Sequence, residues 1–137
     1  MPDFVKPFSG MKPNRKLNKS ELIRALRLNL AAEEEATHLY TAHADACEDP
    51  VVRVALRNIA DEEIIHAGEF QALIERLNPD ESNLFTDGQT EVRWKNALVE
   101  LYSQPGMTIS EAYDIVKREH DMSKTEFDKY WREVSLV

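Results

Sequence analysis

Three side chains of this sequence have the types and the spacing of metal ligands. Glu33 lies seven residues before Tyr40, and Glu63 and His66 form a Glu-x-x-His pair about one helix length further along the chain. Residues three apart on a helix share one face, so the Glu63 carboxylate and the His66 imidazole can reach the same ion. Mixed carboxylate and imidazole ligands suit iron, although zinc or manganese would also accept them.

These residues make up half of a known type of ligand set. A di-iron site inside a four-helix bundle takes one glutamate from each of two helices and a Glu-x-x-His pair from each of the other two. The chain offers Glu33 as the single glutamate, and Glu63 with His66 as the single pair. The pattern therefore predicts a site that only two copies of the chain can complete, so that function requires at least a homodimer.

Two long helices are predicted to position these ligands. The first begins at Asn18, where Glu21 completes a capping-box pattern, and runs to about Glu48. The second has Pro50 in its first turn and ends near Leu77, before the next proline. Two helices of this length with a very short connection form an antiparallel hairpin.

Each predicted helix carries its ligand within an apolar face. The face of the first helix around Glu33 contains Leu22, Leu26, Leu30, Thr37, Tyr40, Ala44 and Cys47. The face of the second around Glu63 contains Val52, Leu56, Ile59, Ala60, His66, Ala67, Phe70, Ile74 and Leu77.

Burying an unpaired carboxylate costs several kcal/mol, a cost that a bound cation removes. An arginine or lysine partner would also neutralise a buried carboxylate. A lone Glu-x-x-His pair on a helix is, in addition, more often an exposed pair than a metal site. The Tyr40 hydroxyl either hydrogen-bonds a ligand carboxylate or belongs to an ordinary core tyrosine.

The remainder of the chain is predicted to be shorter helices. Residues 78–90 have the polar composition of a connection, and a helix is expected from about Thr90 to Tyr102. Two capping-box patterns, which begin at Thr108 and Ser123, predict two further short helices. Their aromatic residues are expected to pack the last two helices together.

The predicted fold class is all-α. We expect an irregular N-terminal arm at residues 1–17, a hairpin and connection at 18–92, and a helical extension at 93–137. The hairpin is expected to dimerise into a four-helix bundle.

Composition excludes several classes of function. The formal net charge of −8 argues against a nucleic-acid partner. Cys47 is the single cysteine, which excludes a disulfide framework and a four-cysteine metal site. The sequence contains no membrane-length apolar run and no signal peptide, so a cytoplasmic location without membrane contact is expected.

Part of the sequence resembles a known family. The residues that carry the resemblance are Ala31-Ala32-Glu33, Leu39-Tyr40, Glu48-Asp49-Pro50 and Ala60-Asp61-Glu62-Glu63-Ile64-Ile65-His66-Ala67-Gly68-Glu69-Phe70. They are similar to the encapsulated ferritins, rubrerythrin-like helical hairpins that travel inside encapsulin shells or are fused to them. The similarity covers roughly residues 18–92, and residues 93–137 depart from the family's pattern.

The resemblance implies a function and a set of partners. It implies a ferroxidase with iron ligands Glu33, Glu63 and His66, at a di-iron centre across a two-fold dimer interface. It also implies assembly into a ring such as a decamer, and a place inside an encapsulin nanocompartment. Glu35 matches one acidic position that some relatives place on the iron entry path, whereas Ala32 occupies another.

Two other functions fit the same residues. In the first, the hairpin binds metal only to hold an oligomer together, and the C-terminal helices bind a partner. In the second, the protein is a rubrerythrin-like peroxidase. That activity usually relies on electrons from a rubredoxin centre, which one cysteine cannot build.

Overall fold

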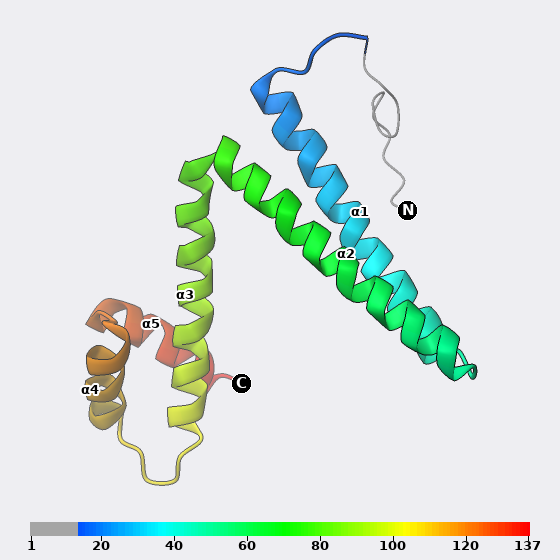
Figure 1. Cartoon of the computed structure of the whole chain (residues 1–137). Helices are drawn as coiled ribbons and strands as arrows, with labels where there is room; N and C mark the ends of the chain where they lie inside the picture. Colours follow the sequence, from blue (N-terminus) through cyan, green and yellow to red (C-terminus); the bar gives the residue numbers. More distant parts are fainter. Residues whose placement is uncertain (1–13) are drawn as a thin grey trace. The chain divides into compact units, whose positions relative to one another are not determined.

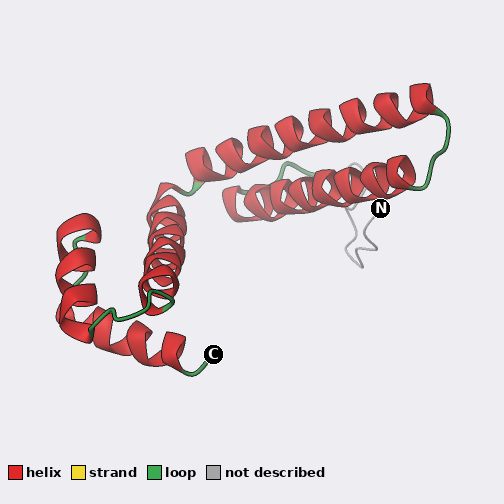
Figure 2. Cartoon of the chain, turned by 90° about the horizontal axis from the view of Figure 1, so that it is seen from below, coloured by secondary structure: helices red, strands yellow, loops and turns green. Residues whose placement is uncertain are grey.

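The computed structural model describes residues 14–137, and all regular structure within that range is α-helical, which confirms the predicted fold class (Figures 1 and 2). The helices are α1 (Lys19–Asp45), α2 (Pro50–Leu77), α3 (Pro79–Tyr102), α4 (Ile109–His120) and α5 (Lys124–Ser135). Contacts divide the chain into two compact units between Ser82 and Asn83. None of the helices within residues 14–137 is both long and apolar enough to cross a membrane. Most of the arm predicted at residues 1–17 lies outside the described residues, and the three-part division of the chain stays a prediction.

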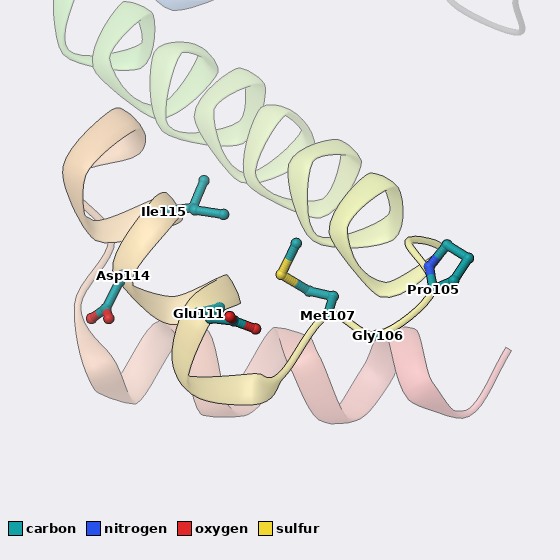
Figure 3. Close-up of a pocket in the computed structure, with 6 residues that line it drawn as sticks. All are labelled: Pro105, Gly106, Met107, Glu111, Asp114 and Ile115. Atoms are coloured by element: carbon teal, nitrogen blue, oxygen red, sulfur yellow. The ribbon is translucent and has the colours of Figure 1, made fainter.

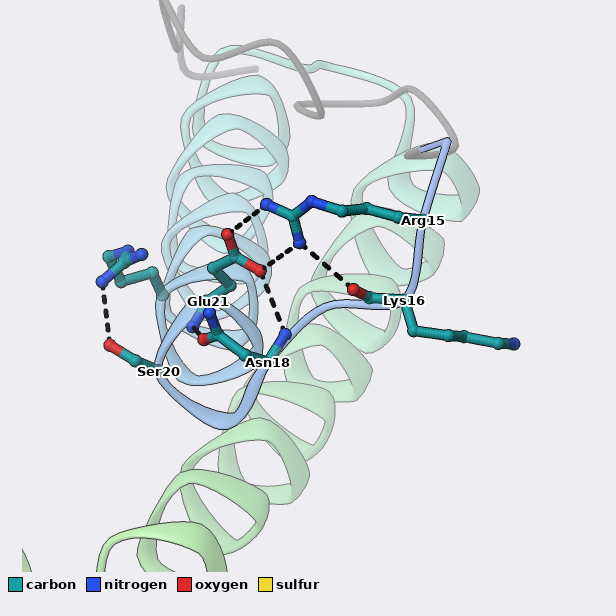
Figure 4. A network of polar contacts seen from close by, with 6 residues as sticks. Arg15, Lys16, Asn18, Ser20 and Glu21 are labelled. Carbon is teal, nitrogen blue, oxygen red and sulfur yellow. Dashed lines mark hydrogen bonds and ion pairs between the residues drawn. The ribbon is translucent and has the colours of Figure 1, made fainter.

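The start of α1 is held by a network of side chains (Figure 4). Asn18 Oδ1 accepts a hydrogen bond from the Glu21 N–H at 2.9 Å, and the Glu21 carboxylate accepts one from the Asn18 N–H at 3.0 Å. The Arg15 guanidinium donates two more hydrogen bonds to that carboxylate, at 2.5 and 2.7 Å. These bonds, with the Arg15 bonds contributing most, lower the pKa of Glu21 to about 2. The predicted capping box is therefore present, and it sets the first residue of α1.

α1 and α2 pack side by side as the predicted hairpin (Figure 1). α2 has the predicted bounds, because Asp49 Oδ1 accepts hydrogen bonds from the Val51 and Val52 N–H groups at 2.9 and 3.1 Å. α1 ends at Asp45 and not near Glu48, so that prediction was wrong. The chain must leave the helix early to bring Asp49 into an extended cap conformation, and Arg53 binds the freed Cys47 carbonyl oxygen.

The connection predicted at residues 78–90 is instead the first half of α3, which begins directly after Asn78. Proline ends one helix but is also favoured in the first turn of the next, where its missing N–H has no partner to lose. Asp80 and Glu81 then lie at the positive end of the helix dipole. Glu81 also accepts a 2.8 Å hydrogen bond from the Asn78 amide and forms an ion pair with Arg27 of α1. These contacts stabilise the first turn of α3, which the polar composition of residues 78–90 did not predict.

The second unit has its own core, which α3, α4 and α5 share. Its buried side chains are Leu98, Leu101, Ala112, Val116, Met122, Phe127 and Tyr130. Phe127 and Trp131 stack with ring centroids 5.3 Å apart, and the Trp94 indole N–H donates to the His120 carbonyl oxygen at 3.2 Å. Both predicted capping boxes are present, at Thr108 and at Ser123. The predicted packing of the last two helices is thus confirmed.

The cap of α4 provides a test of the second unit's stability. Thr108→Ala removes the Oγ that accepts the Glu111 N–H, and it should lower the free energy of unfolding of this unit by about 1 kcal/mol. Both tryptophans, Trp94 and Trp131, lie in this unit, so tryptophan fluorescence during urea unfolding reports on it selectively. Thr125→Ala, an exposed threonine within α5, is the matched control and should change stability by less. Equal effects of both substitutions would contradict this role for the cap.

Candidate metal centre

The hairpin brings the three predicted ligands together. Glu33 comes from the middle of α1, and Glu63 and His66 come from the middle of α2. One ligand atom from each of the three lies within 4.8 Å of the other two. His66 Nδ1 is 3.0 Å from the nearer Glu63 oxygen and 3.9 Å from the nearer Glu33 oxygen. Within residues 14–137, this is the group of three or more such side chains that could hold a metal ion.

A seven-residue spacing explains why these side chains converge. Residues seven apart return to nearly the same side of a helix, so they form a row along it. The row on α1 is Leu26, Glu33 and Tyr40, and Cys47 follows it just beyond the end of the helix. The row on α2 is Leu56, Glu63, Phe70 and Leu77. Each glutamate therefore interrupts a row of buried or half-buried side chains, at the level where the two antiparallel helices pass each other.

The electrostatics are those of a crowded pair of carboxylates. A hydrogen bond with Glu63, together with burial and the negative charge of Glu63, raises the pKa of Glu33 above its usual range. The pKa of Glu63 is lowered, because Glu33 and His66 both hydrogen-bond to it. The hydrogen bond to Glu63 is also the largest cause that raises the pKa of His66. Of the two glutamates, Glu33 is therefore the one that binds a proton more readily.

The cluster lies on an open side of the hairpin. The Glu33 and Glu63 side chains are 22% and 18% exposed, whereas His66 is 50% exposed. His66 belongs to a second row of α2, with Val52, Ile59 and Leu73, whose apolar members are each 40–45% exposed. Two helices alone cannot cover this row. The imidazole therefore lies midway along an uncovered apolar strip.

The donor set fits a divalent transition metal. An ion bound about 2.1 Å from each ligand atom holds neighbouring ligand atoms roughly 3.0–3.4 Å apart and opposing ones roughly 4.2 Å apart. The distances of 3.0 and 3.9 Å from His66 Nδ1 to the two carboxylates lie within that span. Two carboxylates and an imidazole are ligands that iron, zinc and manganese accept. A bound cation would also remove the repulsion between the Glu33 and Glu63 carboxylates. The residues present therefore suit a metal, with only half of a di-iron ligand set in one chain.

Two other candidate residues lie on α1. Tyr40 is half-buried two turns beyond Glu33, and its contact with a ligand carboxylate stays a prediction. Glu35 is also half-buried and engages in an interaction of its own. Glu69, which the sequence reasoning missed as a contributor, adds negative charge beside His66 and further raises its pKa. Its position three residues after His66 was the available signal.

A pocket in the second unit offers no comparable chemistry. It measures about 430 Å³ beside the connection between α3 and α4, and it is lined by Pro105, Gly106, Met107, Glu111, Asp114 and Ile115 (Figure 3). Glu111 is engaged in the α4 cap, where one of its oxygens accepts hydrogen bonds from the Thr108 N–H at 3.0 Å and the Thr108 Oγ at 2.7 Å. Glu111 therefore belongs to the N-terminal cap of α4.

Comparison with known proteins places most of the chain in one family. The family model described as Rubrerythrin matches residues 24–135. The encapsulin nanocompartment cargo protein EncC of Myxococcus xanthus is 42% identical over 76 residues, which are 56% of this chain and 58% of that protein. The ferritin-like–encapsulin shell fusion protein of Pyrococcus furiosus is 41% identical over 75 residues, which are 55% of this chain and 22% of that protein. The chain therefore matches less than two thirds of the length of either relative. No solved structure matches the chain.

The contact between Glu63 and His66 predicts a titration. In metal-free protein, His66 should titrate above its ordinary value near 6.5, and Glu63→Gln should lower the midpoint toward that value. Because the folded-state pKa is the higher one, protonated His66 stabilises the hairpin fully below about pH 6.5. That contribution is lost as pH rises through the raised pKa.

NMR of the histidine ring resonances measures the midpoint. Glu62→Gln is the matched control, since it removes a neighbouring carboxylate on α2 that is not among the causes of the shift. A midpoint that stays raised in Glu63→Gln would show that the contact is not its cause.

Proposed function

The chain belongs to the rubrerythrin family of the ferritin-like superfamily, and we propose that it is a ferroxidase, which oxidises Fe(II) to Fe(III) with dioxygen. The reaction would take place at a di-iron site shared between two copies of the chain. The observation that carries the proposal is the convergence of Glu33, Glu63 and His66 on the uncovered side of the hairpin.

The ligand count supports a homodimer. Two hairpins placed face to face give four helices, which together offer two single glutamates and two Glu-x-x-His pairs. Their four carboxylates carry four negative charges, which two divalent ions neutralise. Dimerisation would also cover Val52, Ile59 and Leu73, which are now nearly half exposed. Complete burial of one such side chain is worth about 1.5–3 kcal/mol, so covering the exposed part contributes on the order of 1 kcal/mol each.

Each side chain has a distinct role in this proposal. Glu63 of each copy would bridge the two ions, while Glu33 and His66 would complete the coordination of one ion each. Iron is the substrate, and each bound Fe(II) supplies one electron to dioxygen. The protein holds the ligands at their spacing, and the apolar strip around His66 would exclude water from the site once the second copy covers it. Glu69 adds negative charge beside the imidazole and favours the approach of cations.

We further propose that the reaction serves iron storage or detoxification within an encapsulin nanocompartment. The names of the two relatives support this, since one is an encapsulin cargo protein and the other is a fusion with an encapsulin shell. In this setting the dimers would assemble into a larger ring, such as a decamer.

The family match also favours a second candidate, a rubrerythrin-like peroxidase. The same three ligands would hold its metal ions. A chain with Cys47 as its single cysteine cannot build a rubredoxin centre, so a separate protein would have to deliver the electrons. Faster oxidation of the bound Fe(II) by hydrogen peroxide than by dioxygen would favour this candidate over the ferroxidase.

Anaerobic titration with Fe(II) tests the proposed site. The protein should bind about two iron ions per dimer, and it should oxidise them rapidly when dioxygen is added. Native mass spectrometry gives the stoichiometry, and an oxygen electrode gives the rate. Glu63→Ala and His66→Ala should each reduce the rate to the background of iron in buffer, while circular dichroism shows that the helices remain.

Glu62→Ala is the control for this experiment, because it removes the adjacent carboxylate on α2 and leaves the cluster intact. It should keep the wild-type stoichiometry and most of the rate. One tightly bound ion in a monomer would refute the shared site. Metal-dependent dimers that consume no dioxygen would instead support a metal that only holds the assembly together.

Co-expression with an encapsulin shell protein tests the proposed compartment. The full chain should co-purify with intact shells and resist added protease while the shells are closed. We expect His66→Ala to be loaded equally well, because the substitution leaves the chain outside the metal centre unchanged. A chain that stays outside the shells would remove this part of the proposal and leave the ferroxidase test unaffected.

A further inference from the structure

α3 carries a second, mainly apolar row that lies largely outside the core of its own unit. At its C-terminal end the Tyr102 ring packs edge-on against the Trp131 ring, with centroids 5.4 Å apart. The row follows a spacing of three and four residues, and its members are Phe85, Gly88, Val92, Lys95, Val99 and Tyr102. Its apolar side chains are well exposed, at 45% for Phe85, 64% for Val92, 50% for Val99 and 49% for Tyr102. This spacing is the heptad pattern of a helix that packs along another helix. We call these six residues the α3 row.

The packing of the second unit accounts for Tyr102 at one end of the row, but not for the exposed Phe85, Val92 and Val99. α3 contributes Leu98 and Leu101 to the core, and these lie on a different face of the helix. Gly88 is in the interior of α3, where glycine costs about 1 kcal/mol relative to alanine. A Cβ built on Gly88 would meet nothing within 4 Å, so nothing in the described chain requires a glycine there. A second helix packed closely against this position would require one.

We propose that the α3 row is an interface between two copies of this chain, in which two α3 helices pair antiparallel. In that arrangement each row position faces a complementary one from the second copy. Phe85 lies opposite Tyr102 of the second copy, and Gly88 lies opposite its Val99. Along the interface, the aromatic pair of Phe85 and Tyr102 is thus followed by Gly88, which leaves room for the branched side chain of Val99. A parallel pairing would instead place Gly88 against Gly88 and leave a gap.

Charge supports the same arrangement. Lys95 is the one charged member of the row, and within the chain its ammonium lies 4.0 Å from the Glu91 carboxylate and 5.2 Å from the Tyr130 ring centroid. Antiparallel pairing places Lys95 opposite Val92 of the second copy, next to that copy's Glu91. Each copy therefore brings one lysine and one glutamate to the centre of the interface. A single polar residue in an apolar seam favours one register and one orientation.

The α3 row and the metal centre are separate surfaces. All six row residues belong to the second unit, whereas Glu33, Glu63 and His66 belong to the hairpin. Two different two-fold interfaces on one chain connect copies beyond a dimer, and they give a closed ring where the rotations between successive copies add up to a full turn. This last consequence rests on the proposed hairpin dimer, but the α3 pairing itself does not.

Disulfide trapping in the full chain tests the pairing and its direction. In a Cys47→Ser background, Gly88→Cys with Val99→Cys should give a covalent dimer as the main product of mild oxidation. The two cysteines lie about 16 Å apart along one helix, so they cannot bond within a chain. Val92→Cys in the same background is the matched control and should stay mainly reduced, because antiparallel pairing offsets the two copies of this residue. Cross-linking by Val92→Cys alone, or by neither variant, would overturn the proposal.

Two further measurements separate this interface from the metal centre. The Gly88→Cys, Val99→Cys cross-link should persist in a Glu63→Ala background, where the metal centre is removed. Conversely, Val92→Glu with Val99→Glu should reduce the iron-loaded assembly to a dimer that retains its iron. Ile109→Glu, at an equally exposed apolar residue outside the row, should leave the assembly mass unchanged. An unchanged mass in the Val92→Glu, Val99→Glu variant would overturn the proposal, and so would a loss of the cross-link with the metal centre.

Discussion

The arrangement of the hairpin depends on one electrostatic constraint: ionisable groups interrupt the apolar faces of both long helices. Glu33 on α1 and Glu63 on α2 meet where the helices pass, and His66 lies beside them. In the single chain, the Glu63 carboxylate raises the pKa of Glu33 and of the neighbouring His66 imidazole. His66 is left half exposed within an uncovered apolar strip. A bound cation would neutralise the two carboxylates, and a second apolar surface would cover the exposed strip. Metal binding and dimerisation therefore belong to one proposal.

Much of the fold could be predicted, because its determinants are local. The three capping boxes and the Asp49–Pro50 start of α2 each involve residues within three positions of one another, and all are present. The predicted ligands converge because a seven-residue spacing fixes which side of a helix they share. The resemblance to encapsulated ferritins is confirmed by the family match and by both relatives. The assignment of Glu33, Glu63 and His66 as iron ligands stays a prediction.

The errors arose where the local signal was ambiguous or the decisive contact was distant. Pro79 was interpreted only as the end of a helix, but it is also the first residue of α3. The ion pair between Arg27 and Glu81, which helps to hold that helix start, joins residues that no periodicity relates. The α3 row was missed for the same reason, since part of it lay in the segment expected to be a connection. Tyr40 shows a further limit, because its place in the row of Glu33 does not decide what its hydroxyl binds.

A ligand set divided between identical chains also affects how activity depends on the amount of protein. A chain that holds half a site has no turnover alone, so in dilute solution the rate would rise with the square of the chain concentration. It would become proportional to concentration only once nearly all chains are paired. Newly made, unpaired chains would then be unable to start oxidation by themselves. Confinement of many copies in a small volume would keep the population in the paired regime, whatever the total number of chains in the cell.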